Sequence, residues 1–168
     1  MKSIFKLLVA AFLTVAPLTV IAHSNVAHIN VQQLISEMPE VIAAQNELAK
    51  LEKDYTTQID NAFKEFQTKA QSYSSDAANQ TDVTNQARQK ELESMQTNLQ
   101  EFRDSAAQEL QKKQMDLMTP LLEKARNAIT KVGEAQGVNY VIDSSPNGGI
   151  ILANGKDLLA DVKKELGF

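Results

Sequence analysis

Two histidines and no cysteine leave this chain few side chains for metal binding or covalent catalysis. The grouping most open to a chemical interpretation is Asp143 followed by Ser144 and Ser145, a carboxylate beside two hydroxyls. An aspartate at a strand end, in a loop rich in Ser, Pro and Gly, is more typical of a turn than of an active site. His28 falls on the polar side of an alternating segment, and His23 has no neighbour that would make it a base or a ligand.

Other catalytic signatures are missing from the sequence as well. It contains no glycine-rich phosphate loop, zinc motif, nucleophile elbow or kinase signature. We therefore expect no catalytic residue, no metal and no cofactor, and predict that the protein is not an enzyme. With 17 basic and 21 acidic residues, the net charge is −4. This acidity argues against a nucleic-acid-binding protein, which normally carries a basic patch.

Residues 1–22 have the pattern of a cleavable export signal. Two lysines precede an apolar run over 7–22, and small residues precede the expected cleavage site at His23. The run is interrupted by Pro17 and is short for a membrane span of about 20 residues. Removal of this signal takes away two lysines and no acidic residue, so the net charge becomes −6.

Long helices are expected in the middle of the chain. Residues 40–119 contain neither glycine nor proline and are rich in Ala, Gln, Glu, Lys and Leu, which favour helix. Val41, Leu48 and Tyr55 recur every seven residues, a spacing typical of a coiled-coil seam.

One polar segment interrupts this helical pattern. Residues 72–84 are rich in Ser, Thr, Asn and Asp, which form caps and turns, and Thr81 or Asp82 suits the N-cap of a second helix. We therefore expect an antiparallel helical hairpin over 39–132 with its tip near 72–84. Gly133 and Gly137 are expected to end the second helix.

The two ends of the chain predict a small body that contains strands. Residues 26–31 alternate as in a strand, and residues 138–143 and 150–153 are strand-like apolar runs. Asn30 suits the N-cap of a short helix over 31–37, with Gln33 placed as in a capping box, and Pro39 suits the first turn of the next helix.

A terminal helix, capped by Asp157 and running to residue 166, completes the expected body over 23–38 and 133–168. The class is therefore α+β and mostly helical. Three short strands make a marginal core, so we expect several chains to share one body. The residues expected at that shared interface are Ala27, Ile29, Val31, Val138, Tyr140, Ile142, Ile150 and Leu152.

Segments 26–35, 137–143 and 157–166, taken together with the glycine-free hairpin, resemble the Skp/OmpH family of periplasmic chaperones. The resemblance covers essentially the whole chain after the export signal. It implies a jellyfish-shaped homotrimer, with a β-barrel body and three hairpin tentacles around a cavity. It also implies an ATP-independent periplasmic holdase that keeps unfolded outer-membrane β-barrel proteins soluble and contacts the membrane only indirectly.

Apolar residues that the hairpin seam leaves unused are candidates for client binding, although each of them also suits the core of the hairpin. They are Tyr55, Phe63, Phe66, Tyr73, Met95, Phe102 and Met115. Pro120 lies inside the second helix, where it leaves the carbonyl of Asp116 without a helical partner, and it is expected to kink the helix and act as a hinge between body and tentacle.

The charge of the hairpin does not favour electrostatic capture of clients or of lipopolysaccharide. Residues 40–132 carry 12 basic and 15 acidic side chains. Arg88, Lys90, Lys112 and Lys113 are therefore interpreted as solvated, and no lipopolysaccharide site is assigned to them.

Two other functions remain open from the sequence. One is a structural coiled-coil protein of the cell envelope, whose hairpin serves as a rigid spacer. The other is an adaptor dedicated to one secreted partner. A holdase would protect several unrelated unfolded barrels, whereas a spacer or an adaptor would bind one defined partner.

Overall fold

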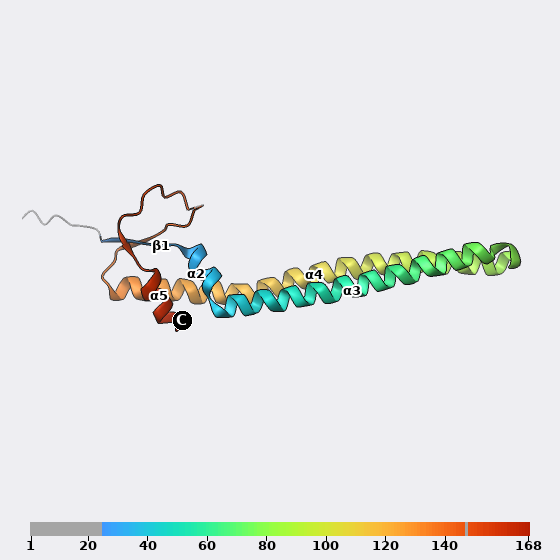
Figure 1. Cartoon of the computed structure of the whole chain (residues 1–168), viewed down its shortest axis with the longest axis horizontal. Helices are drawn as coiled ribbons and strands as arrows, with labels where there is room; N and C mark the ends of the chain where they lie inside the picture. The colour runs from blue at the N-terminus through green and yellow to red at the C-terminus, as the bar shows by residue number, and fades with distance from the viewer. Residues whose placement is uncertain (1–24, 147) are drawn as a thin grey trace, which may run out of the picture.

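A computed structural model describes residues 25–146 and 148–168, so the expected export signal lies outside the described residues. The elements follow in the order β1 (Val26–Ile29), α2 (Val31–Glu37), α3 (Pro39–Asp76), the 3-10 turn η1 (Ala77–Asn79), α4 (Asp82–Ala135), β2 (Tyr140–Asp143), β3 (Lys156–Asp157) and α5 (Leu159–Leu166). Figure 1 shows a small body at one end and two long helices that extend from it. The predicted α+β, mostly helical class is confirmed.

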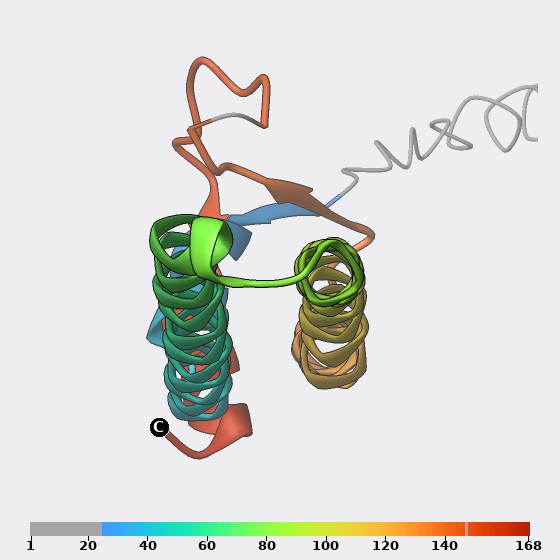
Figure 2. The same ribbon diagram turned by 90° about the vertical axis from the view of Figure 1, so that its right-hand side faces the viewer.

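The two long helices α3 and α4 lie side by side and run in opposite directions (Figures 1 and 2). Pro39 occupies the first turn of α3, as expected, because the extended Met38 before it suits a residue that precedes proline. The Thr81 hydroxyl accepts the N–H of Thr84 at 3.2 Å and caps α4, which confirms Thr81 as the N-cap.

The tip of this hairpin is shorter than the expected 72–84. Residues 72–76 belong to α3, and only residues 77–81 separate the two helices. The Ser75 hydroxyl donates to the carbonyl of Gln71 at 2.8 Å. Serine can remain in a helix when its hydroxyl bonds back to the preceding turn in this way, so the polar composition alone overestimated the length of the tip.

The short helix α2 begins at the predicted cap. The Asn30 side chain accepts the N–H of Gln33 at 2.9 Å. The Gln33 side chain, however, donates to Glu37 at 3.0 Å instead of reaching back to the cap, so the predicted reciprocal capping box is wrong. Because Asn30 is the cap, β1 stops at Ile29, two residues earlier than predicted.

The sheet is parallel and has three strands in the order β2–β1–β3. In β1, Ala27 and Ile29 pair with Val141 and Asp143 of β2, and Ala27 also pairs with Lys156 of β3. The predicted strand over 150–153 is wrong for this chain by itself: those residues belong to no strand, and the third strand is Lys156–Asp157.

One apolar core joins the body to the base of the hairpin. It comprises Ala27, Ile29, Leu34, Met38, Val41, Ala125, Ala128, Val132, Leu158 and Val162. The helix α5 packs on α4. Its N-cap residue is Leu158, so the predicted cap at Asp157 is one residue too early, although a carboxylate oxygen of Asp157 accepts the N–H of Leu159 at 2.8 Å. The core shows why the body needs the base of the hairpin: three of its members, Ala125, Ala128 and Val132, lie on α4.

Gly133 does not end α4, contrary to prediction. The helix continues to Ala135, and Gly137, with φ of 66°, lies in the turn that follows. Pro120 lies inside α4, and this helix of 54 residues continues on both sides of the proline. A hinge at Pro120 stays a prediction.

Candidate functional site

The seam between α3 and α4 is built from small and apolar side chains. Ala44 on α3 and Leu99 and Ala106 on α4 are buried, while most neighbouring residues of the hairpin are half-buried or exposed. A narrow buried stripe on each helix leaves broad outer faces in contact with solvent. The functional question is therefore which apolar side chains lie outside the seam.

Three of the expected client-binding residues take part in contacts within the hairpin. The rings of Tyr55 and Phe102 meet edge to face across the two helices, with centroids 6.0 Å apart. The Tyr55 hydroxyl bonds to Glu109 on the opposite helix. Tyr73 donates to Glu91 at 2.6 Å. These three aromatic side chains therefore hold α3 against α4.

Other members of the expected set face outward. Phe63 is 40% exposed and Met115 is 55% exposed. Phe63 stacks on Phe66 along the same helix, with centroids 6.4 Å apart, and both Phe66 and Met95 are half-buried. Phe63 and Met115 are thus the expected residues with the most apolar surface available to a partner.

The structure adds three exposed apolar residues that the sequence interpretation missed. Ile42, Val83 and Leu122 are 46%, 77% and 45% exposed. Ile42 and Leu122 follow directly after Val41 and Leu121 in sequence, so consecutive apolar residues on a helix were the available signal. Only one of two adjacent residues can face a narrow seam.

A polar cluster near the tip ties the two helices together. Lys69 donates to Glu91 across the hairpin, Arg88 bonds Asp76 at 3.0 Å, and the Arg88 guanidinium lies 4.7 Å from the centre of the Tyr73 ring. Arg88 was expected to be solvated, but its side chain is only 22% exposed. It therefore contributes to the packing of the tip.

The same cluster lowers the pKa of two carboxyl groups. The hydrogen bond from Lys69, followed by that from Tyr73, lowers the pKa of Glu91 from 4.5. The hydrogen bond from Arg88 is the largest cause of the lowered pKa of Asp76. Both groups are accessible to solvent, so the individual ion pairs are weak and sensitive to salt.

Acidification is expected to destabilise the tip through Glu91. Its pKa is lower in the folded chain than in the unfolded chain, so its stabilising contribution is complete above the unfolded pKa and is lost as the pH falls through the folded value. The fall in Tm between about pH 6 and about pH 3 should be smaller for Glu91→Gln than for the unsubstituted protein. Glu93→Gln, at an exposed neighbouring position, is the matched control, and an equal fall for all three proteins would contradict the assignment.

The strand-end grouping Asp143, Ser144 and Ser145 serves the start of α2. One carboxylate oxygen of Asp143 accepts the N–H of Val31 at 3.3 Å and that of Ser145 at 2.9 Å. The Ser145 hydroxyl accepts the N–H of Gln32 at 3.0 Å. Burial raises the pKa of Asp143, but the hydrogen bonds from Ser145 and Val31 outweigh it, so the net pKa is lowered. Through these contacts Asp143 and Ser145 act as turn and capping residues at the start of α2.

The residues expected at a shared interface fall into two groups. Ala27 and Ile29 are each only 1% exposed and belong to the core of this chain, so their side chains are not accessible to a second copy. Val31 and Val138 are half-buried. The remaining four are exposed: Tyr140 by 64%, Ile142 by 39%, Ile150 by 39% and Leu152 by 74%.

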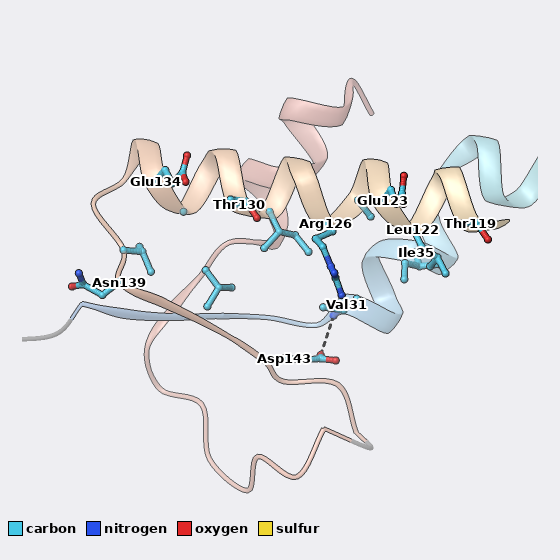
Figure 3. Close-up of a pocket in the computed structure, with 15 residues that line it drawn as sticks. Val31, Ile35, Thr119, Leu122, Glu123, Arg126, Thr130, Glu134, Asn139 and Asp143 are labelled. Atoms are coloured by element: carbon cyan, nitrogen blue, oxygen red, sulfur yellow. Dashed lines mark hydrogen bonds between the residues drawn. The ribbon is translucent and has the colours of Figure 1, made fainter.

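A groove of about 840 Å³ lies between α4, α2 and β2 (Figure 3). Its apolar lining includes Ile35, Ile129 and Val141. Arg126 extends from α4 across the groove toward Val31 and Asp143, and the bond between the Val31 N–H and Asp143 is drawn at its floor. The groove therefore lies between α4 and the side of β2 that carries Val141, and it combines an apolar lining with charged residues such as Arg126 and Asp143.

Within the described residues, no helix is long and apolar enough to cross a membrane. In the same part of the chain, no three acidic or histidine side chains gather in a way that could hold a metal ion.

The fold and these surfaces define a class: a helical-hairpin protein with a small α+β body and apolar side chains exposed along the hairpin. A family model described as "Outer membrane protein (OmpH-like)" matches residues 25–166. The chain belongs to this family, which is the Skp/OmpH family, and the resemblance expected from the sequence is confirmed. A search of curated proteins finds no matching relative.

Proposed function

We propose that this protein is a periplasmic holdase chaperone that binds unfolded outer-membrane β-barrel proteins without ATP and prevents their aggregation. Membership of the OmpH-like family supports a periplasmic chaperone role. The proposal includes export through cleavage of residues 1–22, a homotrimer with the hairpins as tentacles, and no catalytic step, metal or cofactor.

One observation carries this proposal most directly: large apolar side chains remain exposed along a hairpin that is already packed. Phe63, Val83 and Met115 are 40%, 77% and 55% exposed, although the seam is closed by Ala44, Leu99 and the pair formed by Tyr55 and Phe102. Unfolded barrel strands expose alternating apolar residues and unpaired backbone groups. Scattered, flexible apolar contacts can hold many such sequences without selecting one.

The function is tested by diluting urea-unfolded outer-membrane barrel proteins into buffer, with and without the purified protein, and recording light scattering. Suppression of aggregation for several unrelated barrels would support the holdase. Protection of one barrel alone would favour the dedicated adaptor. Equal precipitation with and without the protein would contradict the chaperone proposal and favour the structural spacer.

Replacing the outward-facing apolar residues should weaken this protection. The double variant Phe63→Ser and Met115→Ser is expected to require a several-fold higher protein concentration for half-maximal suppression of aggregation. Each substitution removes apolar surface that is available to clients. Circular dichroism should remain unchanged, since both residues lie outside the seam. The matched control, Gln67→Ser with Gln114→Ser, replaces exposed polar residues close by. If the first variant protects as well as the unsubstituted protein, Phe63 and Met115 do not belong to the surface that binds clients.

A further inference from the structure

Two asparagine–glycine pairs, at 147–148 and 154–155, lie in the connection between β2 and β3. This connection projects away from the helices of the body (Figures 1 and 2). When glycine follows asparagine, the backbone nitrogen of the glycine can attack the asparagine side chain readily, because no Cβ atom obstructs the approach. The two pairs are identical in sequence, so a difference in their reactivity must come from the fold.

The backbone conformation at 154–155 does not explain why a glycine follows the asparagine. A tight hairpin turn with this dipeptide requires positive φ at both residues. Neither Asn154 nor Gly155 has a positive φ. A Cβ atom added to Gly155 would lie 3.5 Å from the carbonyl oxygen of Val26 and 3.7 Å from Cδ2 of His28, which are ordinary van der Waals contacts. The fold therefore has room for a side chain at position 155.

The backbone nitrogen of Gly155 is available as a nucleophile. The N–H of Leu158 donates to the carbonyl of His28 at 3.0 Å. Parallel pairing uses alternate residues, so the N–H of Gly155 faces away from β1. Among the described residues, no backbone carbonyl accepts a hydrogen bond from this N–H group. Asn154 and Gly155 are both exposed and belong to neither a helix nor a strand.

In the pair at 147–148, by contrast, the glycine nitrogen is engaged. The N–H of Gly148 donates to the carbonyl of Ser145 at 2.7 Å, at the short end of the range for such bonds. A Cβ atom at Gly148 would lie 2.6 Å from the carbonyl oxygen of Asp143, so two stretches of backbone are in close contact here. A nitrogen whose proton is held in a hydrogen bond is a poorer nucleophile. The fold therefore protects this pair and leaves the pair at 154–155 reactive.

We propose that Asn154 is a site of spontaneous deamidation through a succinimide, and that it reacts several-fold faster than the pair at 147–148. The nitrogen of Gly155 gives up its proton to solvent and attacks the side-chain carbonyl carbon, Cγ, of Asn154. The new N–Cγ bond closes the ring, and the bond from Cγ to the side-chain nitrogen breaks with ammonia as the leaving group. Water then opens the ring at either carbonyl and leaves isoaspartate or aspartate. One water is consumed and one ammonia is released, and nothing is oxidised or reduced.

The modification alters the attachment of β3 to β1. Isoaspartate adds one carbon atom to the backbone between residues 154 and 155, together with a negative charge. The Nε2–H of His28 donates to the carbonyl of Gly155 at 3.2 Å, and the next residue, Lys156, pairs with Ala27. Because β3 has only two residues, few hydrogen bonds oppose a displacement of Gly155. The proposal concerns the chain alone and does not depend on the chaperone function.

The first test compares the two pairs in one peptide. The native protein and the urea-unfolded protein are incubated in mildly alkaline buffer and then digested with trypsin, which releases residues 132–156 as a single peptide. Fragment-ion mass spectra place each conversion of amide to acid, and a zero-time sample corrects for conversion during digestion. In the native protein, conversion at Asn154 should be several-fold faster than at position 147, whereas the unfolded chain should convert both at similar rates. Equal rates in the native protein, or faster conversion at position 147, would overturn the proposal.

The second test changes the attacking residue. Gly155→Ala should slow conversion at Asn154 several-fold without altering circular dichroism, because the added Cβ obstructs ring closure and fits the fold. The matched control, Ala153→Gly, makes the opposite change on the other side of Asn154, which takes no part in the attack, and should leave the rate nearly unchanged. Electron-transfer fragmentation should identify isoaspartate as the main product. An unchanged rate for Gly155→Ala, or a product without isoaspartate, would rule out the succinimide route.

Discussion

Replacing Leu34 by alanine is expected to lower the free energy of unfolding by about 2–5 kcal/mol, the range for a large-to-small change in a closed core. Leu34 has no exposed surface and belongs to the core cluster with Met38, Val41 and Val162. Val41 belongs to α3, Val162 belongs to α5, and Met38 joins α2 to α3, so a cavity at this position loosens the contact of α2 with two other helices. Urea unfolding followed by circular dichroism measures the change.

The control for this prediction is Ile151→Ala, which removes a similar apolar volume from a fully exposed position. At a protein concentration low enough to avoid self-association, it should change the unfolding free energy by less than about 0.5 kcal/mol. If Leu34→Ala were equally mild, the core described for the single chain would not be its main source of stability.

Replacing Gly133 by leucine is expected to destabilise the protein by about 1–3 kcal/mol through overpacking. A Cβ atom at Gly133 would lie 3.2 Å from Cγ2 of Val141, so a larger side chain must push β2 away from α4. The glycine is unfavourable for the helix itself, by about 1 kcal/mol relative to alanine. Close approach between helix and strand is therefore the reason that a glycine suits this position.

The double variant Gly133→Leu with Val141→Ala tests that reason, because the smaller side chain on β2 makes room for the leucine. The coupling energy from the four unfolding free energies should be favourable and of the order of 0.5–3 kcal/mol. Ala135→Leu, at an exposed position two residues further along α4, should be nearly neutral. Additive effects at Gly133 and Val141 would show that the contact does not limit the size of residue 133.

The predicted elements that local chemistry controls agree with the structure. Asn30 and Thr81 cap the helices that they precede, and Pro39 begins α3. A cap requires only a side-chain oxygen within three residues of a free N–H group, so the sequence contains the whole interaction. The presence of two long helices follows similarly from residues 40–119, which contain neither glycine nor proline, although α4 continues past Pro120 and Gly133 to Ala135.

Predictions that depended on partners distant in sequence were less complete. Tyr73 and Phe102 are candidates for client binding, a role that stays a prediction, and across the hairpin they meet Glu91 and Tyr55. Heptad spacing shows which residues share a face of one helix, but not how the faces of two helices are rotated toward each other. Arg88 was interpreted as solvated for the same reason, although it bonds Asp76 and covers the ring of Tyr73.

The sequence by itself determined the class of this protein: its two long helices, the caps at Asn30 and Thr81, and the family to which it belongs. These properties depend on neighbours within about one helical turn or on apolar periodicity, both of which can be read along the chain. Only the tertiary structure decided that Lys156–Asp157 is the third strand, that Gly133 packs against Val141, and that residues 150–152 stay exposed. Strand pairing and side-chain exposure depend on which segments distant in sequence come into contact, and the pattern of residues along the chain does not specify those contacts.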